Sequence, residues 1–173
     1  MRSLLIVVLG TVLLSGCISN AFQTQVNDSY TLIDNINPSV LNSDIDLNVE
    51  VEAPLNRGSI VVKISDVSLR VTNNHKWSQK LEDQLRLLAI NEFFKYRSLS
   101  KFKYEIKVLK FYGSTDGRVF VSLVCKVQDG DKLVSNQAYV QELIQSEDGY
   151  DALVASLKDG YLNLINKIIL DIK

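Results

Sequence analysis

Residues 119–133, VFVSLVCKVQDGDKL, contain the part of the sequence that decides the fold. Apolar side chains occupy every second position of the first half, namely Val119, Val121, Leu123, Cys125 and Val127. This period of two is typical of a strand with one buried face. Asp129-Gly130 follows at once, and an Asp-Gly pair favours the two-residue turn of a β-hairpin. We therefore predict a hairpin whose second strand covers residues 133–143.

More strands are predicted on the N-terminal side of this hairpin. The clearest one alternates apolar residues with acidic and amide residues, so it has one buried and one solvated face; its apolar positions are Ile45, Leu47, Val49 and Val51. Residues 30–33, 59–65, 67–72 and 102–108 are further strand candidates, rich in β-branched and aromatic residues. A loop carrying Gly113 and Asp116-Gly117 is expected to lead from residues 102–108 into the hairpin.

Two segments change to a helical period. The first has apolar residues at Trp77, Leu81, Leu85, Leu88 and Phe93, which predicts a helix of about five turns that begins near Trp77 with Asn73 or Asn74 as its cap. The second covers residues 151–172, where Gly160 weakens the helix by about 1 kcal/mol relative to Ala and indicates close packing against the sheet. The element order predicts an α+β fold of two layers, an antiparallel-rich mixed sheet with two main helices packed on one face.

The N-terminus has the pattern of a secretory signal. Residues 1–16, MRSLLIVVLGTVLLSG, join one positive charge to an apolar stretch that is shorter than the roughly 20 residues of a spanning helix. Leu14-Ser15-Gly16-Cys17 resembles the lipobox of bacterial lipoproteins. That resemblance implies cleavage before Cys17, S-diacylglycerol on its thiol and acylation of its new amino group. The alternative is an ordinary signal peptide with a chance cysteine nearby.

This interpretation divides the chain into a signal peptide (1–16), a lipidated N-terminus and tether (17–28), and a single domain (29–173). In enterobacterial lipoproteins, an Asp directly after the lipidated cysteine resembles a retention signal for the inner membrane. Here Ile18 and Ser19 follow Cys17 instead. The expected location is therefore the outer membrane of a Gram-negative cell, with the domain facing the periplasm.

Composition excludes several classes of function. The 173 residues contain 19 Lys and Arg against 20 Asp and Glu, a net charge of −1 that argues against a nucleic-acid-binding protein. One histidine and two cysteines cannot build the usual four-ligand Cys/His zinc site, and they allow at most one disulfide. Removal of the signal peptide takes away only Arg2 among the charges.

Few residues suggest catalysis, and we expect neither an enzyme nor a bound cofactor. His75 is interpreted as a solvated residue in a polar loop before the first helix, without a nearby nucleophile. Cys125 lies on the apolar face of a predicted strand, where a cysteine is usually a buried and inert core residue. The pairs Glu82-Asp83 and Glu147-Asp148 have no special spacing and are expected to face water.

Aromatic residues offer the remaining candidates. Trp77 is either an anchor in a partner interface or a residue that packs the helix start onto the sheet, and the second alternative is favoured. A group of aromatic residues surrounds the turn from the first helix into the next strand: Phe93, Phe94, Tyr96, Phe102 and Tyr104. Such a group is more often core than a lipid groove, but an exposed patch would be expected here.

Several segments together resemble the ABC-type transport auxiliary lipoproteins, the PqiC-like or paraquat-inducible lipoproteins. Residues 54–61 (PLNRGSIV) resemble the proline, basic residue and apolar strand of that family, with Arg57 as the basic residue. Residues 74–81 (NHKWSQKL) resemble its helix start, and the YEIKV strand at 104–108, the Asp-Gly turns and the final helix match in order. The loop around Arg57 is shorter than in many members.

The resemblance implies a non-catalytic lipoprotein that serves an ABC transporter and an MCE-domain protein, in systems associated with moving lipids or other hydrophobic molecules between membranes. The lipoprotein would dock the partner's channel against the outer membrane, with Arg57 and Trp77 as possible contact residues. A homo-oligomer is also possible. The alternative is a lipoprotein that binds hydrophobic cargo in its own pocket.

Overall fold

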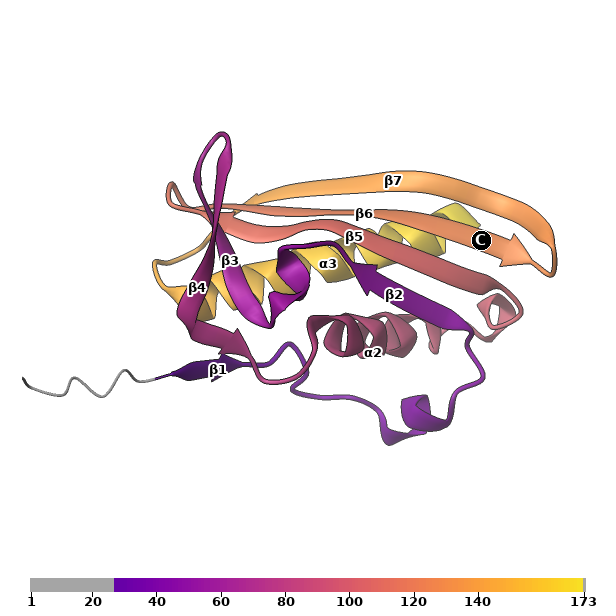
Figure 1. Cartoon of the computed structure of the whole chain (residues 1–173). Helices are drawn as coiled ribbons and strands as arrows, with labels where there is room; N and C mark the ends of the chain where they lie inside the picture. The colour runs from indigo at the N-terminus through magenta and orange to yellow at the C-terminus, as the bar shows by residue number, and fades with distance from the viewer. Residues whose placement is uncertain (1–26, 173) are drawn as a thin grey trace, which may run out of the picture.

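The computed structural model describes residues 27–172, which form a seven-stranded mixed sheet with two helices on one face (Figure 1). Cys17 and the predicted signal peptide lie outside the described residues. The strands are β1 (Asp28–Tyr30), β2 (Leu47–Val51), β3 (Ser59–Ser65), β4 (Ser68–Trp77), β5 (Lys103–Ser114), β6 (Arg118–Asp129) and β7 (Lys132–Ile144). The helices are α2 (Leu81–Phe93) and α3 (Tyr150–Ile172), with short 3-10 turns η1 (Pro38–Asn42), η2 (Leu55–Arg57) and η3 (Arg97–Leu99).

The long strand β5 organises the sheet. β6 and then β7 add to one side of β5 in antiparallel fashion. Its other side is shared: β2 runs parallel to Tyr104–Val108, and β3 runs parallel to Gly113 and Ser114. β4 pairs antiparallel with β3 and parallel with β1. The predicted α+β class, with a mixed sheet and two main helices, is confirmed.

The hairpin of β6 and β7 is confirmed at the predicted turn. Gly130 has a φ of 58°, a left-handed conformation that glycine adopts without steric strain. The inward positions of β6 are the alternating residues of the sequence pattern, and all are buried: Val119, Val121, Leu123, Cys125 and Val127. Asp116-Gly117 likewise forms the turn from β5 into β6, with a φ of 81° at Gly117.

Both helices bury one apolar face against the sheet, and the apolar face predicted for the first is confirmed from Leu81 onward. Leu85 and Phe93 of α2 and Leu157 and Leu164 of α3 are almost completely buried. Gly160 marks the closest approach of α3 to the sheet, because a Cβ there would lie 2.9 Å from Cγ2 of Val121. The expectation that Gly160 permits close packing is therefore confirmed.

The predicted start of the first helix is wrong. Residues 73–77 continue β4, and α2 begins only at Leu81. Neither Asn73 nor Asn74 caps the helix, because both lie in β4, whose pairing with β3 at Val71 and Lys76 and with β1 at residues 75–77 keeps the segment extended. The buried side chain of Gln84 stabilises the chain before the helix: its amide donates to the carbonyl of Gln79, and its carbonyl oxygen accepts from the N–H of Leu32 at 2.7 Å.

Two smaller predictions also need correction. The strand expected at residues 30–33 lies at Asp28–Tyr30, so it begins with the last residue of the predicted tether. Gly113 was expected in a loop but lies within β5. A Cβ at Gly113 would lie 2.6 Å from Cδ1 of Leu153, so the absence of a side chain at this position lets Leu153 of α3 pack closely against β5.

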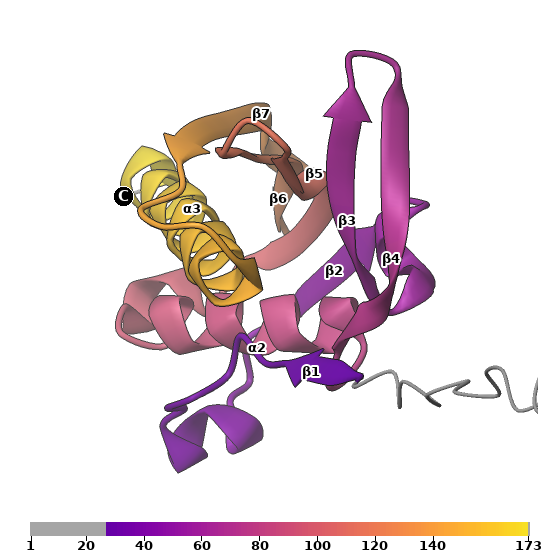
Figure 2. The same ribbon diagram turned by 90° about the vertical axis from the view of Figure 1, so that its left-hand side faces the viewer.

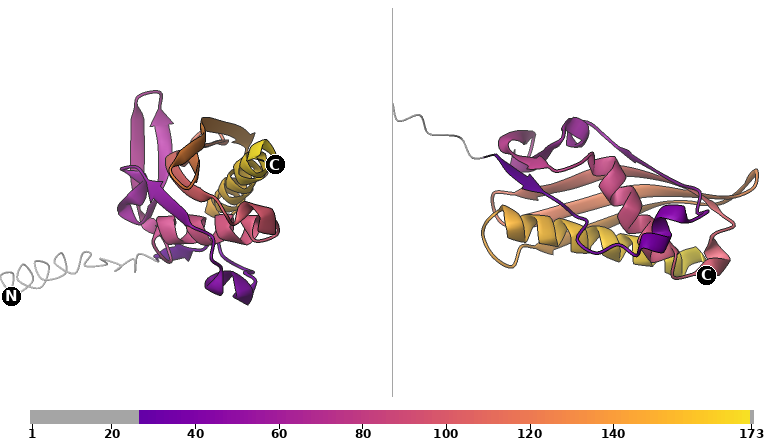
Figure 3. Two further views of the ribbon diagram at one scale, coloured as in Figure 1. Left: turned by 90° about the vertical axis from the view of Figure 1, so that its right-hand side faces the viewer. Right: turned by 90° about the horizontal axis from the view of Figure 1, so that it is seen from below.

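β3 and β4 leave the main sheet as a projecting hairpin. Figure 2 shows their two-stranded ribbon standing clear of the layer formed by β5, β6 and β7. Figure 3 shows β1 and the C-terminal end of α3 at opposite ends of the domain. The first described element and the base of the hairpin therefore share one end of the molecule, since β1 pairs with the end of β4.

Candidate functional site

The tip of the β3–β4 hairpin exposes apolar side chains. Val67, in the turn between the two strands, is 97% exposed, and Ile64 and Leu69 beside it are also exposed. We call these three residues the hairpin tip. Burial of apolar surface stabilises a complex by roughly 25 cal/mol per Å². Binding of a partner that covers the hairpin tip would therefore be favourable.

Aromatic and cationic side chains lie at the foot of the tip. The rings of Tyr112 and Phe120, on adjacent strands β5 and β6, have centroids 5.5 Å apart. The Lys63 ammonium lies 5.7 Å from the Phe120 ring centroid, and the Arg118 guanidinium lies 5.4 Å from it. We call these four residues the aromatic platform. Both cations are within the range of cation–π attraction. These contacts, together with the contact between the two rings, stabilise the arrangement of the four side chains.

Acidic groups offset the positive charge of this region. Lys63 pairs with Asp66 at 3.1 Å, and Arg118 pairs with Asp116 at 2.8 Å and with Glu142 at 3.4 Å. Hydrogen bonding from Arg118 holds the pKa of Asp116 well below its usual range. A surface of exposed apolar side chains with balanced charges suits a protein partner better than a polyanion.

The two predicted contact residues, Arg57 and Trp77, are neighbours at the base of the hairpin. The backbone N–H of Trp77 donates to the carbonyl of Gly58 at 2.9 Å, next to Arg57 in the turn η2. Arg57 is exposed, and its guanidinium has no hydrogen-bond or ion-pair partner within residues 27–172. The Trp77 side chain is only 7% exposed and packs against Phe111, with ring centroids 5.9 Å apart. Its burial agrees with the favoured alternative, packing within the fold, although its place is the end of β4 and not a helix start.

His75 has a structural setting that the sequence did not indicate. It lies in β4, and its ring stacks on Tyr150 of α3 with centroids 3.6 Å apart. Its Nδ1 lies 3.1 Å from the Tyr30 hydroxyl and 3.4 Å from a carboxylate oxygen of Asp28. The prediction of a solvated loop residue is therefore wrong, because pairing extends β4 through this segment. His75 joins β1, β4 and α3 into one cluster at the end where the described chain begins.

The other residues weighed for catalysis occupy ordinary positions. Glu82 and Asp83 lie in the first turn of α2, where negative charge stabilises the helix dipole. Glu147 and Asp148 are exposed in the loop before α3. Within residues 27–172, no three His, Cys, Asp or Glu side chains gather as metal ligands. No helix of that same part of the chain has the length and apolar character needed to cross a membrane.

Cys125 is predicted to be unreactive in the folded protein. It is 1% exposed, and burial raises the pKa of its thiol to about 12. Because the thiolate is the reactive form, alkylation at pH 8 should be roughly a thousandfold slower than for a free cysteine. Mass spectrometry of the Cys125 peptide after timed alkylation measures this rate, and the same protein in denaturant is the control. Equal labelling of native and denatured protein would contradict this position for the side chain.

The aromatic group after α2 divides between the core and the surface. Phe93 and Tyr104 are buried with ring centroids 4.3 Å apart, and the Tyr104 hydroxyl donates to the carbonyl of Leu99. Phe94 is 37% exposed, and with Tyr96 it lines a hollow of about 440 Å³ at the end of α2. The expectation of mainly core residues with one exposed patch describes this region well.

The described residues thus define an α+β module with a projecting hairpin, attached at its β1 end to the N-terminal segment. Residues 46–169 match the family described as the ABC-type transport auxiliary lipoprotein component. The chain belongs to this family, as its resemblance indicated.

Solved structures support the same fold. The structure of an uncharacterized protein superposes with a TM-score of 0.73 at 25% identity, covering 86% of this chain and 99% of its own. Protein XCC0632 from Xanthomonas campestris, of family DUF330, superposes with a TM-score of 0.66 at 16% identity, covering 82% of this chain and 92% of its own. No curated protein matches the chain.

Proposed function

We propose that this protein is a non-catalytic docking subunit of an envelope ABC transport system, anchored in the outer membrane by lipid on Cys17. Its partner is an MCE-domain protein of a system that moves lipids or other hydrophobic molecules. The family supports the auxiliary role in transport, and the hairpin tip is the observation that carries the docking role.

The hairpin is suited to reach a partner because it stands clear of the sheet (Figure 2). The aromatic platform lies at the foot of its tip, and a hollow of about 290 Å³ between them is lined by residues that include Ile64, Thr115 and Arg118. Tip and platform therefore offer an apolar projection beside two half-buried aromatic rings, and apolar and aromatic side chains are enriched at the centres of protein interfaces.

The contacts of β1 support a fixed position of the hairpin base relative to the proposed membrane anchor. β1 is the first described element, and Asp28 and Tyr30 hold it to His75 near the base of the hairpin. In our proposal, a short lipidated segment precedes β1, so the end of the domain that carries the hairpin base stays near the membrane. Arg57 lies at this same end and is available for a polar contact with the partner.

The alternative, a cargo-binding lipoprotein, has less support from the packing. Large side chains fill the space between the sheet and the helices, including the fully buried Tyr104, Tyr161, Phe93 and Phe111. Native mass spectrometry of the protein would show stoichiometric lipid if the alternative were correct. We expect the docking subunit to carry no such cargo in this core.

Replacing Val67 by aspartate tests the docking role. A carboxylate at the hairpin tip would have to lose its hydration in the interface, so recovery of MCE-domain and ABC components after crosslinking should fall at least about tenfold. Affinity purification from crosslinked cells, followed by quantitative mass spectrometry, measures the recovery.

Leu170→Asp is the matched control, because Leu170 is 68% exposed on α3, away from the hairpin. This variant should recover the partners as the native protein does. Undiminished recovery with Val67→Asp, at equal protein levels, would contradict docking through the hairpin. Recovery of neither class of component by the native protein would contradict the proposed function as a whole.

A further inference from the structure

β7 is the outermost strand of the sheet, and within residues 27–172 no strand pairs with its outer side. Figure 1 shows it along the margin of the sheet, next to β6. With 13 residues, it is the longest strand of the described chain. A strand at the edge of a sheet presents unpaired N–H and C=O groups that can pair with a further strand. The outer side of β7 is therefore open to strand addition.

β7 has little of the protection that edge strands usually carry. Charged side chains, proline and short length keep edge strands from pairing with other chains. Residues 133–141 (LVSNQAYVQ) contain neither a charge nor a proline, and a bulge at Val134 is the one interruption in the pairing of β7 with β6. At the other edge of the sheet, β1 is only three residues long and begins with Asp28. Of these two edge strands, only β7 is long and free of charge over most of its length.

The side chains of β7 divide between the helix layer and the solvent. Tyr139 is buried, and its hydroxyl donates to a carboxylate oxygen of Asp171 in α3 at 2.9 Å. The apolar side chains of Val134, Val140 and Ile144 are exposed instead. The edge therefore combines open backbone groups with apolar side chains that a partner strand would cover.

One hydrogen bond identifies the backbone groups that point outward. The N–H of Gln145, directly after β7, donates to the carbonyl of Gly117 at 2.8 Å, and the register between β6 and β7 is regular over residues 135–144 of β7. Successive residues of an antiparallel ladder point their N–H and C=O groups to opposite sides, so every second residue points away from β6. These residues are Asn136, Ala138, Val140, Glu142 and Ile144.

The apolar side chains of this edge complement those of a second copy of the chain. Two copies of β7 can pair in antiparallel fashion about a two-fold axis at Tyr139. In that register, Val140 lies opposite Ala138 of the second copy, and Ile144 lies opposite Val134. Apolar pairs across neighbouring strands are the contacts that stabilise a sheet. Each exposed apolar side chain of the edge therefore meets another apolar side chain.

The single charge of the regular edge selects the same register. About Tyr139, the carboxylate of Glu142 lies opposite Asn136 of the second copy, whose amide can donate a hydrogen bond to it. The neighbouring symmetric registers, centred on Ala138 or Val140, would place Glu142 opposite Val134 or Ala138. A carboxylate that faces an apolar side chain loses water without gaining a hydrogen bond, which disfavours both registers.

We propose that β7 is a self-association surface, at which two copies of the chain pair about Tyr139 and form a dimer with one continuous sheet. Ala138 faces Val140, and Asn136 faces Glu142. The backbone groups of all four residues point outward, so each pair exchanges two hydrogen bonds. The two copies use the same surface, so the assembly closes at two chains. β3 and β4 lie across β5 from β7, which leaves the hairpin of each copy free, and the proposal does not rest on the docking role.

Light scattering during size-exclusion chromatography of the full-length protein in a maltoside detergent measures the number of chains per particle. We expect two. Val140→Lys brings a hydrated charge next to the axis, so the dissociation constant of the dimer should rise at least about tenfold. Leu170→Lys is the matched control, because Leu170 of α3 is 68% exposed and Val140 is 67% exposed. It should dimerise as the native protein does, and circular dichroism should show both variants folded.

Cysteine crosslinking tests the register. Gln137 lies opposite Gln141 of the second copy in a non-hydrogen-bonded pair, where Cα atoms are about 4.5 Å apart and a disulfide can form. Gln137→Cys/Gln141→Cys should therefore give a disulfide-linked dimer on a non-reducing gel after mild oxidation. Each single variant lacks the opposite thiol and is the control. All three variants also carry Cys125→Ser, because Cys125 of β6 is paired with position 137.

The outcomes decide the proposal separately from docking. A dimer that crosslinks only as the double variant supports it. A native particle of any other size would overturn it, as would an unchanged dimer in Val140→Lys. Absence of a crosslink in the double variant, or a crosslink in either single variant, would also overturn it. Val67→Asp should remain a dimer, because Val67 lies in the β3–β4 turn and not in β7.

Discussion

Replacing Phe111 by alanine is expected to lower the free energy of unfolding by about 3–5 kcal/mol. Phe111 is 2% exposed and lies between Trp77 of β4 and Tyr161 of α3, with ring centroids 5.9 and 6.5 Å away. Truncation would open a cavity where the base of the hairpin, the central strand and α3 meet. Small domains have a total stability of about 5–15 kcal/mol, so this loss is a large fraction.

Urea unfolding followed by circular dichroism measures the change. Phe94→Ala is the matched control, because it removes the same side chain from a half-exposed position and should change stability by about 1 kcal/mol or less. Similar losses in the two variants would contradict the packing of Phe111 against Trp77 and Tyr161.

Replacing Cys17 by serine is expected to abolish lipid attachment. In our proposal this cysteine carries every acyl chain of the protein, and burial of acyl chains stabilises membrane attachment by about 0.8 kcal/mol per CH₂. Incorporation of radiolabelled palmitate should therefore fall to background, and processing before residue 17 should stop. Cys125→Ser is the control and should be labelled normally, because Cys125 is buried in β6. Undiminished label in Cys17→Ser would contradict the lipoprotein assignment.

The strands with one buried face were predictable, because apolar residues at every second position of a strand all lie on its buried face. In both β6 and β2, the apolar residues of the alternating pattern are the buried ones, as predicted. The second half of β4 was not predictable in this way. Asn73 and Asn74 have no apolar period, and they are extended because the strand is paired on both sides of them. β3 pairs with Val71 and Lys76, and β1 pairs with residues 75–77. That pairing joins residues far apart in the sequence.

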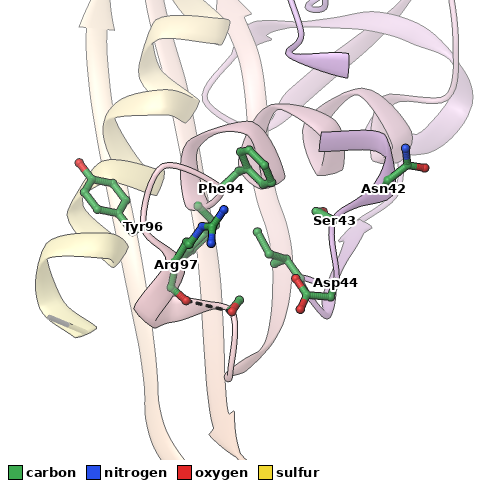
Figure 4. A pocket seen from close by; sticks show the side chains of 9 residues that line it. Asn42, Ser43, Asp44, Phe94, Tyr96 and Arg97 are labelled. Carbon is green, nitrogen blue, oxygen red and sulfur yellow. Dashed lines mark hydrogen bonds between the residues drawn. The ribbon is translucent and has the colours of Figure 1, made fainter. Parts of the chain in front are cut away.

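The same limit applies to the surface sites. The pattern predicted strands at residues 59–65 and 67–72, with Val67 as the first residue of the second strand. The fold instead places Val67 in the turn of a hairpin that stands clear of the sheet. The aromatic group after α2 was visible in the sequence. Its exposed part lines a hollow only because the fold brings residues 42–45 to the end of α2 (Figure 4). Arg57 was selected by family resemblance, and Trp77 also by its residue type. The backbone hydrogen bond from Trp77 to Gly58 brings the end of β4 next to the turn that carries Arg57.

Site-specific photocrosslinking at the hairpin tip tests the central claim most directly. A photoreactive amino acid at Val67 should form a covalent adduct with an MCE-domain protein in cells, and mass spectrometry should identify the crosslinked peptide. The same group at Leu170 should form no such adduct, because Leu170 lies on the opposite layer of the domain. No adduct at Val67, with the photoreactive protein correctly anchored and at native abundance, would contradict docking through the hairpin.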